Sequence, residues 1–278
     1  MFSITKRHIQ LYFHRKITVF FSLMGAWIAF ALYLVFLQKN MQEDWSKVAD
    51  YKLILDNWVI GGTLAVTSIT TTWTGMGRMV KDKESHKIDD FLLTDLSRFK
   101  LNLSYLLSAS IVGVLMQVIM FAIMSVYFYW QDKLVVAFDK FPQLCLIMIL
   151  SSFLGASLGG LIVQRVKSVD VVSRLSTIIG TASGFLVGVY MPIGALPSYA
   201  QNLVKLFPGA YVAAIYRQIL THDQLEGSSL GIREYLGIGI KWSRLIDAKE
   251  SIILIIIVTL VSLFFTYIGQ LAKVRKLS

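Results

Sequence analysis

One short motif in this chain has the spacing of a catalytic site. Gly155-Ala156-Ser157-Leu158-Gly159 follows the G-x-S-x-G pattern, which in serine hydrolases places the serine on a sharp turn between a strand and a helix. Here the motif lies in the middle of an apolar run, and no predicted membrane span contains a histidine that could act as the base. We therefore interpret the match as accidental and predict no catalytic residue.

Motifs for binding nucleotides or metals are also missing. The sequence has no G-x-x-x-x-G-K-[ST] loop for phosphates and no H-E-x-x-H pair for zinc, and its four histidines are scattered. The single cysteine, Cys145, can form neither an intrachain disulfide nor a thiolate cluster. We predict that the chain binds no metal or cofactor, and that its energy source lies on another protein.

The most informative candidate site is a charged segment, residues 80–100, between two long apolar runs. It combines charges of alternating sign with a compact apolar group. Such a patch with a charged rim is typical of a helix that docks on a soluble partner. A helix that binds only lipid should be plainly basic, whereas acidic and basic side chains are nearly balanced here. The residues predicted to take part in docking are Lys81, Glu84, Asp89, Asp90, Phe91, Leu92, Leu93, Thr94, Asp95, Leu96 and Arg98.

Polar side chains inside the apolar runs are candidates for a substrate pathway. Four threonines follow helical spacing at Thr63, Thr67, Thr70 and Thr74, and Gln117 is a lone amide in the next run. A row of hydroxyls can line a polar path. It can equally bond to carbonyls of its own helix or hold a neighbouring helix, and both interpretations stay open.

Small residues recur at a spacing that lets helices approach closely. Gly155 and Gly159 lie in one apolar run, and Gly180, Gly184 and Gly188 follow one another by four in the next. This pattern is typical of tight helix packing inside membranes, either within one subunit or across a dimer.

Composition places all these residues in an integral membrane protein of the all-α class. The 278 residues are 55% hydrophobic and 16% charged, with a mean hydropathy of +0.63. A span needs about 20 mostly apolar residues. We treat residues 1–278 as one transmembrane domain. Six runs qualify as predicted spans: Ile17–Leu37, Trp58–Met79, Leu101–Tyr129, Leu144–Val163, Leu175–Val189 and Ile252–Gln270.

The segments between and before the spans have their own character. Residues 1–16 mix apolar and basic side chains and predict a helix lying in the headgroups, with a simple basic anchor as the alternative. Residues 191–250 hold three of the four prolines and predict short helices and a loop on the outer face. Six spans would place both termini on the same side of the membrane. That side, counting the termini and the loops they share it with, holds 16 of the 27 lysines and arginines. Because cytoplasmic loops are enriched in these residues, we assign both termini to the cytoplasm. The positive charge then reflects topology and anionic lipids, and nucleic-acid binding is a poor explanation.

This layout resembles the ABC-2 type permease family, the membrane half of one class of ATP-binding-cassette exporters. In residues 80–100, Glu84 and the run Asp90–Arg98 are similar to the family's coupling helix, although Asp95 stands where a proline is common. Leu196-Pro197 through Tyr211, followed by Arg217, is similar to the family's paired outer helices. The resemblance covers nearly the whole chain.

The resemblance implies a multi-pass permease subunit in a plasma membrane, which the family suggests is bacterial. Such a subunit would move an amphiphilic cargo outward, for example a drug, antibiotic, peptide or lipid-like molecule. Two ATPase subunits would carry ATP and magnesium, and a second permease, identical or not, would complete twelve spans. Alternatives are a permease for polysaccharides or lipid-linked glycans, a sensor or immunity subunit that moves no solute, and an intramembrane hydrolase using Ser157.

Overall fold

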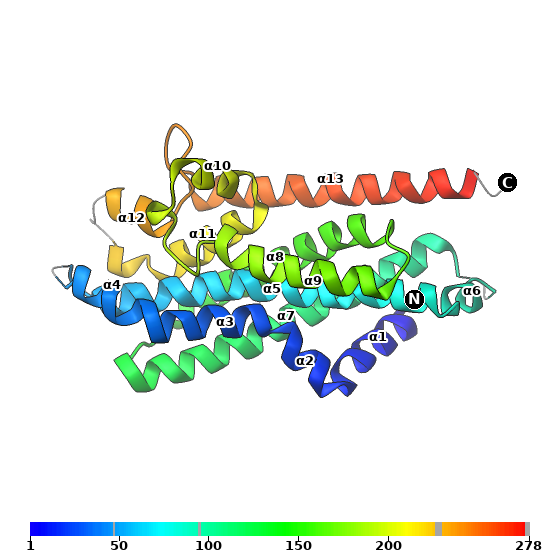
Figure 1. Cartoon of the computed structure of the whole chain (residues 1–278), viewed down its shortest axis with the longest axis horizontal. Coiled ribbons are helices and arrows are strands. Elements are labelled where there is room, and N and C mark those ends of the chain that lie inside the picture. Colours follow the sequence, from blue (N-terminus) through cyan, green and yellow to red (C-terminus); the bar gives the residue numbers. More distant parts are fainter. Residues whose placement is uncertain (47, 94–95, 226–229, 276–278) are drawn as a thin grey trace.

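The computed structural model describes residues 1–46, 48–93, 96–225 and 230–275, and the regular elements within these ranges are helices. Figure 1 shows them as an elongated bundle. Two helices, α5 (Tyr51–Glu84) and α7 (Arg98–Asp132), are the longest, at 34 and 35 residues. At a rise of about 1.5 Å per residue each is roughly 50 Å long, which exceeds the hydrocarbon thickness of a bilayer.

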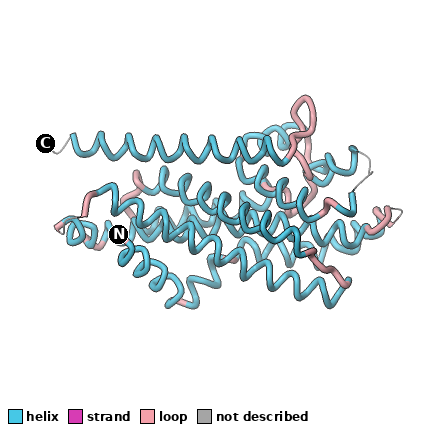
Figure 2. The backbone as a smooth tube through the Cα atoms, turned by 180° about the vertical axis from the view of Figure 1, so that it is seen from behind, coloured by secondary structure: helices cyan, strands magenta, loops and turns pink. Residues whose placement is uncertain are grey.

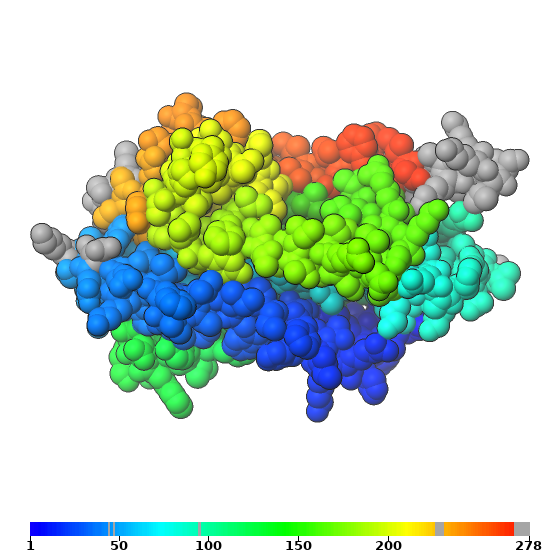
Figure 3. Space-filling model, viewed as in Figure 1, coloured from blue at the N-terminus to red at the C-terminus, as the bar shows by residue number. Residues whose placement is uncertain are grey.

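Helix α5 forms the centre of the bundle. It packs against α7, α8 (Phe141–Val163), α9 (Val169–Leu186) and α11 (Pro208–Leu220). Glycines in α5 allow these close approaches. At Gly62, for example, a side chain would not fit, because an added Cβ would lie only 2.7 Å from the Arg217 guanidinium. In the space-filling view the N-terminal segment and residues around 170–210 cover most of this helix (Figure 3).

The first predicted span is bent. It corresponds to α2 (Lys16–Ser22), α3 (Met24–Leu32) and a π-helical turn at Tyr33–Leu37, and α4 (Gln38–Asp44) follows directly after it. The axis turns by 48° after Ser22. Helix α1 (Phe2–His14) precedes it and packs against α7.

Four described helices are long and apolar enough to cross a membrane, and a fifth crossing is added if the bent pair counts as one. The four are α5, α7, α8 with the turn before it, and α13 (Ala248–Arg275). The predicted fifth span, Leu175–Val189, corresponds to α9, which is not among them. Helix α9 starts with Asp170 and Arg174 in its first turns and is about 27 Å long at the usual rise. The prediction of an all-α membrane protein is confirmed, and by length and apolar composition four or five of the six predicted spans are found among the described helices.

Helix α13 lies along one edge of the bundle, against α8 and α11 (Figures 1 and 2). Much of its surface is apolar and exposed, including Ile253, Leu260 and Phe264, which suits contact with lipid tails. The start of α1 and the last turns of α13 lie at the same end of the bundle as α6 (Lys87–Leu92). The opposite end holds α4, α10 (Ser198–Leu206), α11 and α12 (Leu230–Leu236).

Candidate functional site

The docking segment predicted from the sequence contains one short helix, α6, between the ends of α5 and α7. His86 adopts a left-handed conformation (φ 57°) that reverses the chain after α5. Its Nδ1 lies 3.1 Å from a carboxylate oxygen of Asp89 in the first turn of α6. Ser97 then caps α7 by accepting a hydrogen bond from the Lys100 backbone N–H. These local contacts place α6 across the tips of the two longest helices.

The two faces of α6 have different surroundings. Ile88, Phe91 and Leu92 pack against an apolar cluster that includes Met76 of α5 and Tyr105 of α7. The residue after the helix, Leu93, is 89% exposed. The apolar group predicted as one patch is therefore divided: Phe91 and Leu92 attach α6 to the bundle, and Leu93 is available to a partner.

The charged residues predicted for docking surround this helix. Asp89 and Asp90 are exposed on α6, and Arg98 is exposed at the start of α7, while Lys81 is half-buried on α5. Leu96 is half-buried and packs against the same apolar cluster as Phe91. Thr94 and Asp95 lie outside the described residues.

A groove of about 480 Å³ runs beside α6 and is bordered by charges of both signs. Glu84 and Asp89 contribute carboxylates, and Arg98 and Lys167 contribute cations, with Leu92 at its apolar side. A surface of this kind favours a partner that carries a complementary mixture of charges.

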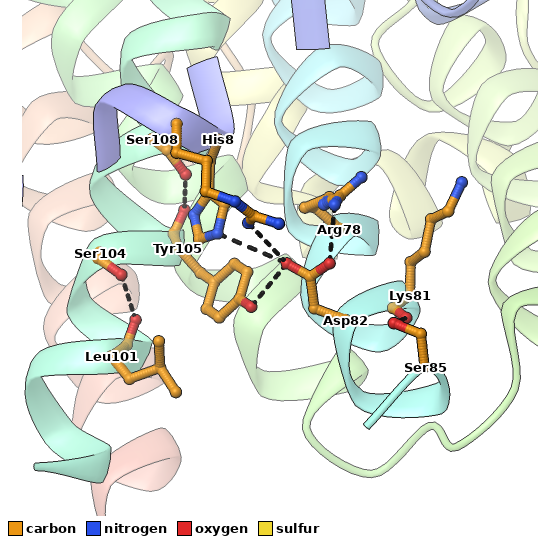
Figure 4. Close-up of polar contacts among 10 residues, drawn as sticks. His8, Arg78, Lys81, Asp82, Ser85, Leu101, Ser104, Tyr105 and Ser108 are labelled. Atoms are coloured by element: carbon orange, nitrogen blue, oxygen red, sulfur yellow. Dashed lines mark hydrogen bonds and ion pairs between the residues drawn. The ribbon is translucent and has the colours of Figure 1, made fainter. Parts of the chain in front are cut away.

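Directly behind α6 is a polar cluster that the sequence analysis missed, which we name the Asp82 cluster: Arg7, His8, Arg78, Asp82 and Tyr105. The fully buried Asp82 carboxylate lies 2.8 Å from Arg78, its neighbour one turn earlier on α5. It accepts hydrogen bonds from the Tyr105 hydroxyl at 3.0 Å and from Arg7 at 3.4 Å (Figure 4). The cluster joins α1, α5 and α7 at the level of α6.

His8 occupies the protected side of this cluster. Its ring stacks on Tyr105 with centroids 4.2 Å apart. Its Nε2 lies 3.6 Å from Asp82, which is an ion-pair distance but longer than a hydrogen bond. Burial lowers the pKa of His8 below its ordinary value. The nearby Asp82 carboxylate acts in the opposite direction and raises this pKa, whereas Arg7 and Arg78 lower it further, and the net effect is a lowered pKa. The ring is therefore neutral at neutral pH.

Arg7 connects the Asp82 cluster to α6 itself. Its guanidinium carbon lies 5.3 Å from the centre of the Phe91 ring, in a cation–π contact. The chain of contacts runs from Phe91 through Arg7 to Asp82, and so from α6 to α5. A displacement of α6 would therefore change the contacts of the Asp82 carboxylate through Phe91 and Arg7.

The polar residues considered for a substrate pathway are mostly engaged in packing. Thr67 and Thr70 donate hydrogen bonds to carbonyls of their own helix, and Thr63 is fully buried. Thr74 also donates to its own helix but is half-buried. The Gln117 amide, fully buried, joins α7 to α8 and α11 through Ser152 at 2.9 Å and the Tyr216 hydroxyl at 2.6 Å.

The five glycines predicted to let helices pack closely differ in how near other atoms lie to them. A Cβ at Gly155 would overlap the Thr72 side chain, and one at Gly159 would lie 3.3 Å from Met76, so both sit where α8 crosses α5. Gly184 faces Tyr190, and Gly188 has φ 66° where the chain turns after α9. A Cβ added at Gly180 would meet no atom within 4 Å. In the same region of α8, the Ser157 hydroxyl is buried and donates to the Leu154 carbonyl.

At the opposite end of the bundle, Arg217 of α11 is fully buried. Its guanidinium donates to four carbonyls, those of Trp58, Val187, Gly188 and Gly237, at 2.7 to 3.4 Å. It also lies 4.9 Å from the centre of the Trp58 ring. This one side chain thus binds α5 to the turn after α9 and to the end of α12. Asp56, near the same end of α5, is also fully buried and accepts a hydrogen bond from Tyr33.

The arrangement has no assembled catalytic group among the described residues, and its distinctive feature is the short helix α6 with a charged groove beside it at one end of the bundle. Residues 38–268, most of the chain, match the family model described as ABC-2 family transporter protein. The chain belongs to the ABC-2 transporter family. The resemblance inferred from the docking segment is thereby confirmed, and the chain is a multi-pass membrane protein of that family. No curated protein matches the chain. Helices α1, α2 and α3 all precede the matched region, so the family model does not cover Arg7 and His8 of the Asp82 cluster.

Proposed function

We propose that this ABC-2 protein is the permease subunit of an exporter and that α6 is its coupling helix. The observation that carries the proposal is the division of α6 into two faces. Leu93 is exposed for a partner, whereas Phe91 is held to the bundle and contacts Arg7 of the Asp82 cluster. A helix built in this way can receive a push from a soluble subunit and pass it to α5 and α7.

The energy would come from two ATPase subunits that carry ATP and magnesium. Each ATPase would hold one coupling helix, and a second permease subunit would complete the transporter in a plasma membrane, with both termini cytoplasmic. The placement of α1, α6 and the end of α13 at one end of the bundle supports this arrangement. Exposed Asp89 and Asp90 would set the register on the ATPase surface.

An amphiphilic cargo is supported by an apolar cleft of about 360 Å³ between α5, α8, α9 and α11. Trp73, Leu158 and Phe207 give it aromatic and aliphatic walls, and Ser68 and Ser151 add hydroxyls. No charged side chain lines it within the described chain. Such a lining favours a drug-like, peptide or lipid-like molecule over a small ionic solute.

The coupling helix is tested by co-purification of the tagged protein with its ATPase in mild detergent. Leu93→Asp removes the exposed apolar contact without disturbing the inward face of α6. We expect the ATPase to be lost from this variant. Leu206→Asp is the matched control, because Leu206 is 74% exposed on α10 at the opposite end. Retention of the ATPase by Leu93→Asp at the wild-type level would refute the proposed docking surface.

The cleft is tested separately by export of a fluorescent amphiphile from cells or vesicles. Leu158→Trp fills the cleft and should lower export while the ATPase still co-purifies. Ile253→Trp adds the same bulk on the exposed surface of α13 and should leave export unchanged. Equal export by both variants would exclude the cleft as the cargo site.

A further inference from the structure

A second cavity lies on the other side of the Asp82 cluster from α6. It measures about 310 Å³ and is enclosed by α1, α2, α5, α7 and α9. Three cationic side chains line it, Arg15 from the end of α1 and Arg78 and Lys81 from α5. None of the described residues that line it is acidic. The cavity is thus a basic pocket at the end of the bundle that holds the N-terminus.

Two of these three cations have no carboxylate partner. Arg78 is paired with Asp82, but neither Arg15 nor Lys81 forms an ion pair with any residue that the structure describes. Figure 4 shows Lys81 extending away from Asp82. Cations gathered without counter-charges repel one another, and a bound anion would relieve this repulsion.

The remaining lining suits a phosphate group attached to an apolar body. Thr18 and Ser173 supply hydroxyls at the rim, and Leu11, Val112 and Val172 supply apolar walls. An arginine fork and a lysine ammonium are the usual partners of phosphate oxygens. Basic pockets between helices on the cytoplasmic side are typical sites for lipid headgroups.

Access from the membrane is provided by α2. Ile17, Phe20 and Phe21 beside Thr18 are all more than half exposed, so this helix presents apolar surface next to the pocket. A lipid whose tails lie against these side chains would have its headgroup at the level of Arg15.

We propose that this pocket binds the phosphate group of an anion, presented either by an anionic lipid of the adjoining leaflet or by a soluble phosphate compound. The bound phosphate would bridge Arg15 at the end of α1 to Lys81 and Arg78 on α5. It would thereby fasten α1 beside the Asp82 cluster, so that occupancy of the pocket sets how firmly α6 is coupled to the bundle.

The test uses the full-length protein in nanodiscs of phosphatidylcholine with increasing fractions of phosphatidylglycerol. Apparent melting temperature and the number of lipids retained in native mass spectrometry are measured. The double variant Arg15→Gln/Lys81→Gln is compared with Lys16→Gln/Lys100→Gln, which loses the same charge outside the pocket. In a parallel arm, inorganic phosphate is titrated into discs of phosphatidylcholine alone.

We expect the wild type and the control variant to be stabilised by phosphatidylglycerol, and the pocket variant to need at least about tenfold more, since each lost charged contact costs about a factor of ten. A response to phosphatidylglycerol that the pocket variant loses, with no response to inorganic phosphate, would support the pocket and assign it to a lipid. A response to inorganic phosphate that the pocket variant loses would support it and assign it to a soluble compound. Identical responses of the two double variants in both arms would overturn the proposal.

Discussion

Replacing Asp82 by asparagine should loosen the end of the bundle that carries α6. Asparagine keeps the shape of the side chain and an acceptor for Tyr105, but it removes the negative charge facing Arg78 at 2.8 Å and Arg7 at 3.4 Å. The Arg78 contact is a close ion pair to a fully buried carboxylate, and we assign it about 1.5–3 kcal/mol, the range for hydrogen bonds to charged groups. The Arg7 contact is worth about 0.5–1 kcal/mol, because that side chain is 35% exposed and is screened by water.

The sum is a loss of about 2–4 kcal/mol, which corresponds to a fall of roughly 5–15 °C in the melting temperature of a chain this large. Melting in detergent, followed by tryptophan fluorescence at a fixed scan rate, measures it. Asp139→Asn is the matched control, because Asp139 is exposed and forms no ion pair among the described residues. A melting temperature of Asp82→Asn equal to that of the control would refute the claim that this carboxylate holds α1, α5 and α7 together. In a double-mutant cycle, the losses of stability caused by Asp82→Asn and Arg78→Gln should be strongly non-additive.

Three further changes test other parts of the structure. Arg217→Met should cost about 3–5 kcal/mol, because four buried carbonyls lose their donor, and Arg217→Lys should recover only part of it in the same melting assay. Lowering the pH from 6.5 toward 5 should lower the melting temperature, because the unfolded chain protonates His8 before the folded chain does, and His8→Gln should flatten this dependence; an unchanged slope would contradict the assignment. Gly155→Val should cost about 1–3 kcal/mol by overlap with α5, whereas Gly180→Ala should change the melting temperature little; equal effects would show that the close crossing is wrongly placed.

Hydropathy predicted the long helices well because each is a continuous apolar run that must satisfy its backbone internally. The span predicted at Leu175–Val189 is not among the helices that pass the test of length and apolar composition. Its polar first turns and the reversal at Gly188 shorten α9, and an apolar count over a window does not register where a helix ends. The family itself was recognisable from the docking segment and the outer helices, because those motifs are local in sequence.

Contacts between distant segments could not be predicted in this way. The spacing of Arg78 and Asp82 by one turn was a visible signal for an ion pair, but nothing in the sequence indicated that Arg7 and His8 would join it. Arg217 belongs to a motif that was noted, yet its burial depends on carbonyls from three separate segments. The orientation of α6, which divides Leu92 from Leu93, depends on the turn at His86.

Two fully buried charged side chains, Asp82 of α5 and Arg217 of α11, hold opposite ends of α5. Asp82 fastens the end of α5 next to α6, and Arg217 binds the carbonyl of Trp58 near the other end. Asp82 follows Trp58 by 24 positions in α5, which corresponds to about 36 Å of continuous helix and is stiff on this scale. A tilt imposed on α6 would therefore reach the helices at the other end of the bundle as movement of one rigid body. In the exporter that we propose, substitutions at Asp82 and Arg217 should then both uncouple ATP hydrolysis from export, although the two residues lie too far apart to affect each other by contact.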